Sequence, residues 1–152
     1  MNKKEYTDGE WRMGISLLGC SDVEIKSLTI SSSGGDGIYI DGYKDLHFSE
    51  NIIIDNVIST NNKRQGISII SAKNVWVKNS VFKNTKGTLP EAGLDIEPDN
   101  EADVIINVNI QNCSFTNNYH SGIVIGLDNL TDKSEPVSIN FKDCYLSMNH
   151  DV

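Results

Sequence analysis

A short pattern that recurs five times constrains the fold of this chain more than any other feature of its sequence. Each copy reads glycine, apolar, variable, apolar, variable, and the copies occupy residues 14–18, 37–41, 66–70, 93–97 and 122–126. Their glycines are 23, 29, 27 and 29 residues apart. Because apolar and variable residues alternate, each copy is expected to form a short strand with one buried face.

A second pattern follows each copy. It reads apolar, variable, apolar, variable and then Asn, Asp or Ser, at residues 23–27, 52–56, 75–79, 108–112 and 139–143. An apolar residue comes three positions later in four of the units, and Ser59 takes this place in the other. Each unit therefore predicts three short strands. One unit cannot bury its apolar face alone, but stacked units share a continuous core.

The last residue of the second pattern is expected to lie at a bend. Side chains at equivalent bends can bond to the backbone and to one another along the stack. The expected ladder consists of Ser27, Asn56, Asn79, Asn112 and Asp143.

The repeat resembles the right-handed parallel β-helix proteins of the pectate lyase-like superfamily. The resemblance implies an all-β solenoid of about five coils with three short strands per coil. We expect residues 14–152 to form one β-helix domain, which can be part of a longer solenoid, and residues 1–13 to form an N-terminal cap or lead-in. The superfamily includes polysaccharide lyases, polygalacturonase-type hydrolases, alginate epimerases and phage tailspikes. It therefore implies carbohydrate processing and an extracellular, cell-surface or virion location.

Charge and composition exclude other classes. Thirteen Lys and Arg against 21 Asp and Glu give a net charge of −8, which disfavours binding to nucleic acids or anionic membranes. No apolar run is long enough to span a bilayer, and no signal peptide is recognisable. Three widely spaced cysteines indicate neither a disulfide framework nor a zinc site. Cys113 and Cys144 fall on successive coils within disulfide range, but buried thiols are favoured.

Three carboxylates on the outward face of the first strands are the candidate catalytic groups. Asp95 and Glu97 share one strand and one face, with Cα atoms roughly 6.6 Å apart, and Asp41 is expected roughly 9.6 Å from Glu97. Inverting glycosidases use carboxyl groups roughly 6.5 to 9.5 Å apart. We therefore predict Asp95 and Glu97 as acid and base, assisted by Asp41, with the close like charges raising one pKa.

The neighbouring outward positions supply candidate substrate contacts. Arg64 and His120 lie one coil to either side of Asp95 and could hold the carboxylate of an acidic sugar. Tyr39 offers a ring for sugar stacking, and Ser68 lies between Tyr39 and Asp95 in the same column. A uronate lyase or epimerase could use Arg64, His120 and Tyr39 differently, to neutralise the carboxylate and remove a proton.

Two interpretations without catalysis stay open. Polar outward residues are also what a solvated face requires, and the chain could be a β-helix segment used for adhesion or as a phage-tail or surface-protein shaft. The sequence thus predicts a polysaccharide partner and leaves open whether the chain is an enzyme; an enzyme would be a glycoside hydrolase or lyase. Self-association or continuation of the solenoid at its ends is also expected, because exposed strand edges invite pairing.

Loop insertions around residues 43–48, 99–106 and 128–136 are expected on one side, as one wall of a groove, with residues 86–91 as the other wall. No cofactor is indicated. The acidic residues Asp99, Glu101 and Asp103 could supply oxygen ligands for calcium. The run lacks the glycine and spacing of an EF-hand, so an acidic surface loop is the favoured interpretation.

Overall fold

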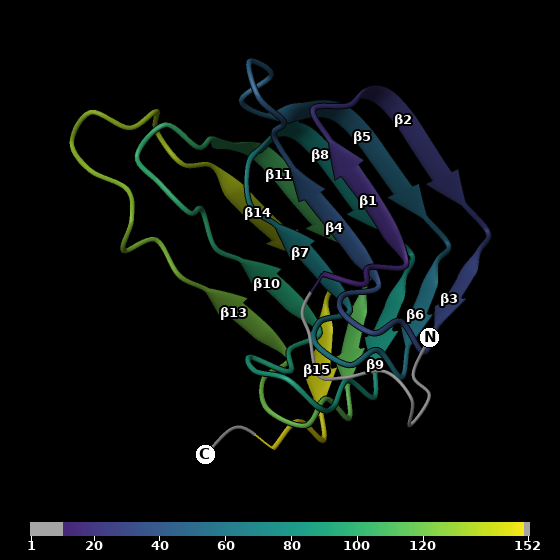
Figure 1. Cartoon of the computed structure of the whole chain (residues 1–152). Helices are drawn as coiled ribbons and strands as arrows, with labels where there is room; N and C mark the ends of the chain where they lie inside the picture. Colours follow the sequence, from purple (N-terminus) through teal and green to yellow (C-terminus); the bar gives the residue numbers. More distant parts are fainter. Residues whose placement is uncertain (1–10, 151–152) are drawn as a thin grey trace.

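The computed structural model describes residues 11–150, which form a β-solenoid of three parallel sheets (Figure 1). The first sheet holds β1 (Ile15–Leu18), β4 (Ile38–Asp41), β7 (Ile67–Ile69), β10 (Leu94–Ile96) and β13 (Ile123–Ile125) in that order. The second holds β2 (Ser21–Lys26), β5 (Ser49–Asp55), β8 (Ala72–Lys78), β11 (Ile105–Gln111) and β14 (Ile139–Lys142). The third holds β3 (Thr29–Ser31), β6 (Ile58–Thr60), β9 (Val81–Lys83), β12 (Ser114–Thr116) and β15 (Tyr145–Ser147).

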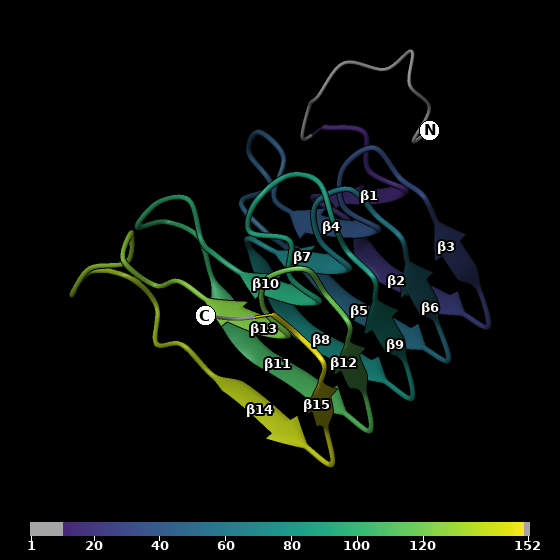
Figure 2. The ribbon, with the colours of Figure 1, turned by 90° about the horizontal axis from the view of Figure 1, so that it is seen from below.

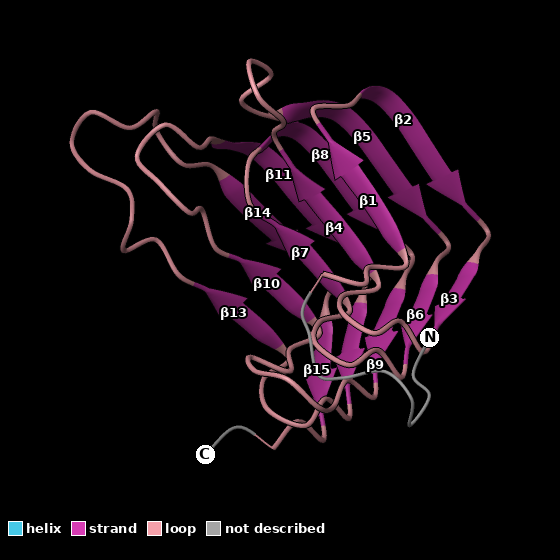
Figure 3. Ribbon diagram, in the orientation of Figure 1, coloured by secondary structure: helices cyan, strands magenta, loops and turns pink. Residues whose placement is uncertain are grey.

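These sheets confirm the predicted all-β solenoid with three strands in each coil. Successive coils stack along one axis, so each strand pairs with its equivalents one coil away (Figure 2). The ribbon of the described residues consists of strands and loops (Figure 3). None of residues 11–150 belongs to a helix of the length and apolarity that crossing a membrane requires. The predicted cap or lead-in at residues 1–13 lies mostly outside the described part of the chain.

The apolar residues of the repeat meet inside the solenoid. Ile38, Ile67 and Leu94 are paired in register along the first sheet, and all three are fully buried. In the third sheet, Phe82 and Phe115 are paired and their rings stack with centroids 5.4 Å apart. The alternation in sequence thus becomes one apolar column per inward position, which in the third sheet is interrupted by the buried Ser59.

The last strands leave core positions partly open. Ile125, Phe141 and Leu146 continue the apolar columns, yet they are 44%, 40% and 48% exposed. Their equivalents one coil earlier, Ile96, Ile110 and Phe115, are almost completely buried. Association of this face with a further coil or a second copy stays a prediction.

Asparagine ladders hold the bends, as predicted. The Asn112 side chain donates to Asn79 at 2.8 Å and Asn56 donates to Ser27 at 3.2 Å, although Asn79 turns to Asp55 at 2.8 Å instead of to Asn56. The five predicted bend residues all have left-handed backbone conformations, with φ between 50° and 56°. Asparagine tolerates this conformation better than other residues that carry a Cβ. A second ladder that the sequence analysis did not identify joins Asp22, Asn51, Asn74 and Asn107.

A further amide column lies inside the solenoid. The fully buried Asn118 side chain accepts hydrogen bonds from the Thr85 backbone N–H and hydroxyl, at 3.3 and 3.0 Å. It donates to the Phe82 carbonyl at 3.3 Å and to the Asn149 side chain at 3.1 Å. It therefore satisfies buried polar groups of three coils.

Replacing Asn118 with alanine is expected to lower the free energy of unfolding by about 1–3 kcal/mol, because buried polar groups would lose their partners. Chemical denaturation followed by circular dichroism measures the change. Asn140→Ala is the control, since its exposed side chain makes a single 3.3 Å bond to Asn109 and should cost less than about 0.5 kcal/mol. Equal losses in the two variants would contradict the assigned role.

The three cysteines are free thiols in the structure, as favoured from the sequence. Cys113 is buried, and Cys20 and Cys144 are half-buried. Burial raises the pKa of the Cys113 thiol to about 11. Cys113 therefore acts as a small core residue and not as a reactive group.

Candidate functional site

A buried polar network covers the outward face of the first sheet. Its centre is Asp36, which directly precedes the repeat glycine of β4 and is fully buried. Its carboxylate accepts a hydrogen bond from the Ser68 hydroxyl at 2.8 Å and one from the Gln65 backbone N–H at 3.2 Å. It also forms an ion pair with Arg64 at 3.3 Å. Burial raises the pKa of Asp36, and the charge of Arg64 partly offsets this shift.

Asp36 and Gln65 are not among the residues predicted from the sequence. An aspartate beside a glycine is typical of a turn, and only its place beside the outward column of β7 could have indicated another role. Gln65 has the equivalent position one coil later. Both residues take part in the network only through hydrogen bonds to residues of neighbouring coils.

Asp95 lies on β10 beside this network and is fully buried. Its Oδ2 accepts a hydrogen bond from the Gln65 side-chain amide at 3.0 Å, and the same amide accepts one from Ala92 N–H at 2.9 Å. The Oδ1 of Asp95 is buried without a hydrogen-bond partner among residues 11–150. Burial and then the charge of Glu97 raise the pKa of Asp95 to about 7. The Asp95 carboxyl group is therefore about half-protonated near neutral pH.

The structure thus brings Asp95 and Glu97 together, as the alternation predicted, but it exposes them unequally. Glu97 is half-buried, whereas Asp95 presents no surface to solvent. A sugar in contact with Asp95 would have to displace the side chains that cover it. The assignment of this pair as acid and base therefore stays a prediction.

The predicted substrate contacts also take part in contacts within the protein. Arg64 is ion-paired with Asp36, and Ser68 is fully buried beside the same carboxylate. His120 is half-buried, with its Nδ1 3.1 Å from the Ser121 hydroxyl. Arg64 and Ser68 therefore both bind the Asp36 carboxylate. Their roles in binding a substrate stay predictions.

Asp41 and Tyr39, at the end of β4, form a more accessible arrangement. The Tyr39 hydroxyl donates to Asp41 Oδ2 at 3.1 Å, and Gly42 N–H donates to Oδ1 at 2.7 Å. Tyr39 is largely covered, and the exposed Trp11 packs edge-on against it with ring centroids 6.3 Å apart. Burial raises the pKa of Asp41, and the nearby charges of Asp103 and Asp99 add to this shift.

Asp41 lies between two cavities of about 300 Å³ each. One cavity is lined by Trp11, Met13, Ser16, Leu18, Tyr39, Asp41, Gly42 and Tyr43. The other is lined by Asp41, Gly42, Tyr43, Lys44, His47, Asn100 and Asp103. The residues common to both are Asp41, Gly42 and Tyr43, so the carboxylate and the exposed Tyr43 separate the two hollows.

The long loops form the predicted wall on one side of the first sheet. The loops after β10 and β13 extend together in Figure 1, and they are joined by hydrogen bonds from Asn129 to the Pro98 carbonyl at 3.1 Å and from Ser134 to the Glu101 carbonyl at 2.8 Å. The loop after β4 meets the loop after β10 at the second cavity, which contains His47 and Asn100. Residues 86–91, which were predicted as the opposite wall, precede β10 and line neither cavity beside Asp41. A groove between the two walls stays a prediction.

The acidic loop at residues 99–103 was considered as a calcium site, but the Asp103 carboxylate binds groups of the same loop. Asp103 Oδ2 accepts hydrogen bonds from the Asp99 and Asn100 backbone N–H groups, at 2.8 and 3.0 Å, and from the Asn100 side chain at 2.9 Å. Across residues 11–150, no group of three or more His, Cys, Asp or Glu side chains is arranged to hold a metal ion. The hydrogen bonds indicate that Asp103 stabilises the turn.

Comparison with known proteins identifies the family. The model of the family described as "Right handed beta helix region" matches residues 8–151. The chain is 37% identical over 126 residues to the uncharacterized protein YclG of Bacillus subtilis (strain 168). That match covers 75% of this chain and 22% of YclG, so the chain spans less than a quarter of this curated relative. No solved structure matches. The chain therefore belongs to the right-handed β-helix family.

Proposed function

We propose that this β-helix domain binds a neutral polysaccharide along the outward face of the first sheet, with Asp41 as the central contact. The observation that carries the proposal is the position of Asp41 between two adjoining cavities, with aromatic side chains beside it. A linear polymer can occupy both cavities and pass over the carboxylate between them. Concave sites with aromatic walls and a few fixed polar groups are typical ligand sites.

The lining residues suit sugars. Trp11 and Tyr43 are exposed. The Trp11 ring is available to the C–H face of a sugar, whereas the Lys44 ammonium lies 4.9 Å from the centroid of the Tyr43 ring and covers one of its faces. The Asp41 carboxylate is held in place by Tyr39 and Gly42, and its remaining lone pairs can accept hydrogen bonds from sugar hydroxyls. The carboxylate would be oriented before the ligand arrives, which lowers the entropic cost of binding.

The charges near Asp41 favour a neutral ligand over a uronate. Asp99 and Asp103 lie close enough to raise the pKa of Asp41, and Arg64 is already paired with Asp36. The second cavity is lined by one lysine, Lys44, and by the two carboxylates of Asp41 and Asp103, so a uronate carboxylate would still meet an excess of negative charge. Binding of a neutral sugar is therefore favoured over the lyase and epimerase hypotheses.

Replacing Asp41 with asparagine is expected to weaken polysaccharide binding at least about tenfold, because hydrogen bonds to a charged acceptor contribute about 1.5–3 kcal/mol. Isothermal titration against a panel of neutral and acidic polysaccharides measures the change. Glu50→Gln, on the second sheet, removes the same charge away from the cavities and serves as the control. Failure of every polysaccharide to bind, or equal binding by both variants, would favour the adhesion or shaft interpretation.

Hydrolysis by Asp95 and Glu97 is the second candidate function. The observation that favours it is the raised pKa of Asp95, since a general acid must hold a proton near neutral pH. Release of reducing ends from a bound polysaccharide, lost in both Asp95→Asn and Glu97→Gln, would support hydrolysis. Unsaturated products with ultraviolet absorbance would support a lyase instead.

A further inference from the structure

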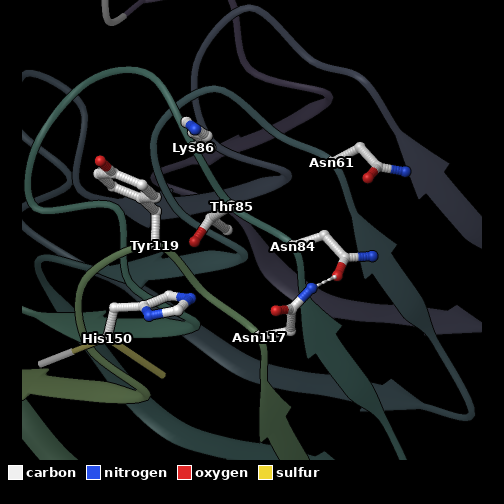
Figure 4. Close-up of a pocket in the computed structure, with 7 residues that line it drawn as sticks. All are labelled: Asn61, Asn84, Thr85, Lys86, Asn117, Tyr119 and His150. Carbon is white, nitrogen blue, oxygen red and sulfur yellow. Dashed lines mark hydrogen bonds between the residues drawn. The ribbon is translucent and has the colours of Figure 1, made fainter. Parts of the chain in front are cut away.

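A third cavity lies at the turns that connect the third sheet to the first. Its volume is about 510 Å³, larger than either cavity beside Asp41. The residues that line it are Asn61, Asn84, Thr85, Lys86, Asn117, Tyr119 and His150 (Figure 4). No residue is shared with the cavities beside Asp41, so this hollow is a separate site.

Two columns of side chains form its walls, one residue from each successive coil. Backbone hydrogen bonds from Tyr119 to Thr85 at 2.9 Å and from His150 to Asn118 at 3.3 Å stack Lys86, Tyr119 and His150 along the solenoid. The other column consists of the left-handed residues Asn61, Asn84 and Asn117. Equivalent side chains in such columns recur about every 4.8 Å. The cavity is thus an elongated hollow with a regular row of amides on one side.

The cation in this hollow is held in place. Lys86 Nζ lies 4.3 Å from the centroid of the Tyr119 ring, and the His150 ring is 6.1 Å from the same ring. Figure 4 shows the Lys86 ammonium and both rings at the rim of the same hollow, across from Asn84 and Asn117. A cation above an aromatic face loses part of its freedom but keeps its hydrogens for an anion.

The amide column also leaves groups for a ligand. The Asn117 side-chain NH₂ donates to Asn84 at 2.6 Å, and the Asn84 NH₂ donates to Thr60 at 3.1 Å. Asn117 uses its amide as a donor in this column, so its side-chain oxygen can accept a hydrogen bond from a ligand. Asn61 belongs to the same column, and its side chain is exposed. None of the seven lining residues is acidic, although acidic residues outnumber basic ones by 21 to 13 in the chain.

We propose that this cavity binds a sugar unit that carries an anionic group, such as a uronate carboxylate or a sulfate ester. Lys86, positioned by Tyr119, binds the anion, and Asn61 and Asn117 bond to hydroxyls. The volume exceeds what an inorganic anion fills, and the row of amides suits a polyhydroxylated ligand. The charge preference is opposite to that at Asp41, and the inference does not depend on the function proposed for that site.

Titration with an oligogalacturonate, with a sulfated oligosaccharide, with a neutral oligosaccharide of the same length and with sodium sulfate tests this proposal. The oligogalacturonate is expected to bind more tightly than sodium sulfate, and its binding is expected to weaken as the salt concentration rises. Lys86→Gln should reduce its affinity at least about tenfold, as expected for loss of a charged hydrogen bond. Tyr119→Phe should bind normally, whereas Tyr119→Leu should weaken binding, because only the phenyl ring preserves the position of the ammonium.

Lys73→Gln is the matched control. Its ammonium also lies over an aromatic ring, 5.8 Å from the centroid of Phe48, but it is on β8 and lines none of these three cavities. Normal affinity in this variant is expected. The proposal is overturned if neither the oligogalacturonate nor a sulfated oligosaccharide binds, if Lys86→Gln binds them normally, or if Lys86→Gln weakens binding of the neutral sugar as much as binding of the oligogalacturonate.

The two sites can be tested separately. Asp41→Asn should leave oligogalacturonate binding unchanged, and Lys86→Gln should leave binding of neutral polysaccharide unchanged. Loss of both activities in either variant would overturn the assignment of two independent sites. Failure of one ligand alone identifies which of the two proposals is wrong.

Discussion

Asp95→Asn is expected to stabilise the protein at pH 8 by about 4 kcal/mol. The side chain is fully buried, one of its oxygens has no hydrogen-bond partner among the described residues, and its pKa is raised to about 7. Asparagine resembles the protonated carboxyl group in shape and stays neutral at every pH. It can still accept the hydrogen bond from Gln65, so the substitution removes a buried charge without breaking this contact.

The direction of the pH dependence follows from proton binding. An unfolded aspartate titrates near pH 4, so between about pH 4 and pH 7 the folded protein binds more protons than the unfolded chain. Stability from Asp95 is therefore complete below about pH 4 and is lost as the pH rises through about 7. The raised pKa values of Asp36, Asp41 and Asp99 act in the same direction.

Chemical denaturation of both proteins from pH 4 to pH 8 measures this effect. The difference between the variant and the parent should be smallest at pH 4 and should grow toward pH 8. Asp55→Asn is the control, because hydrogen bonding to Asn79 lowers the pKa of this half-buried carboxylate and the substitution should not stabilise the protein at pH 8. A difference that stays constant with pH would show that Asp95 is not a buried titrating group.

Phe115→Ala is expected to lower the free energy of unfolding by about 3–5 kcal/mol, the usual cost of removing a buried aromatic ring. Phe115 is fully buried, and its ring stacks on Phe82 at 5.4 Å with an interplanar angle of 12°. The ring belongs to a column shared by successive coils. The void left by the substitution would therefore weaken contacts with the coils on both sides. In a solenoid, such contacts between neighbouring coils supply much of the stability.

Urea denaturation compared with Phe141→Ala tests the origin of this loss. Phe141 occupies a core column in the last strand of the second sheet but is 40% exposed. Phe141→Ala should lower the free energy of unfolding clearly less than Phe115→Ala does, because water already reaches one side of the Phe141 ring. Equal costs would show that the apolar columns do not act as one core.

The sequence alone determined which residues face inward and how the strands stack. Alternation has a period of two, which is a local property, so residues such as Ile38, Ile67 and Leu94 could be assigned to the core without any knowledge of their neighbours. The bend asparagines were also readable, because their position in the repeat is fixed. For the same reason the sequence placed Asp95 and Glu97 on one face of one strand.

Only the tertiary structure decided which outward residues are exposed. Asp95 is buried because groups from other coils, including Gln65, pack beside it, and Asp41 is accessible because the loops after β4 and β10 leave hollows around it. These loops have no repeat, and the contacts join residues about 30 positions apart, as in the Gln65 to Asp95 hydrogen bond. A period in the sequence fixes the direction of a side chain, whereas its exposure depends on how irregular segments from other coils pack against it.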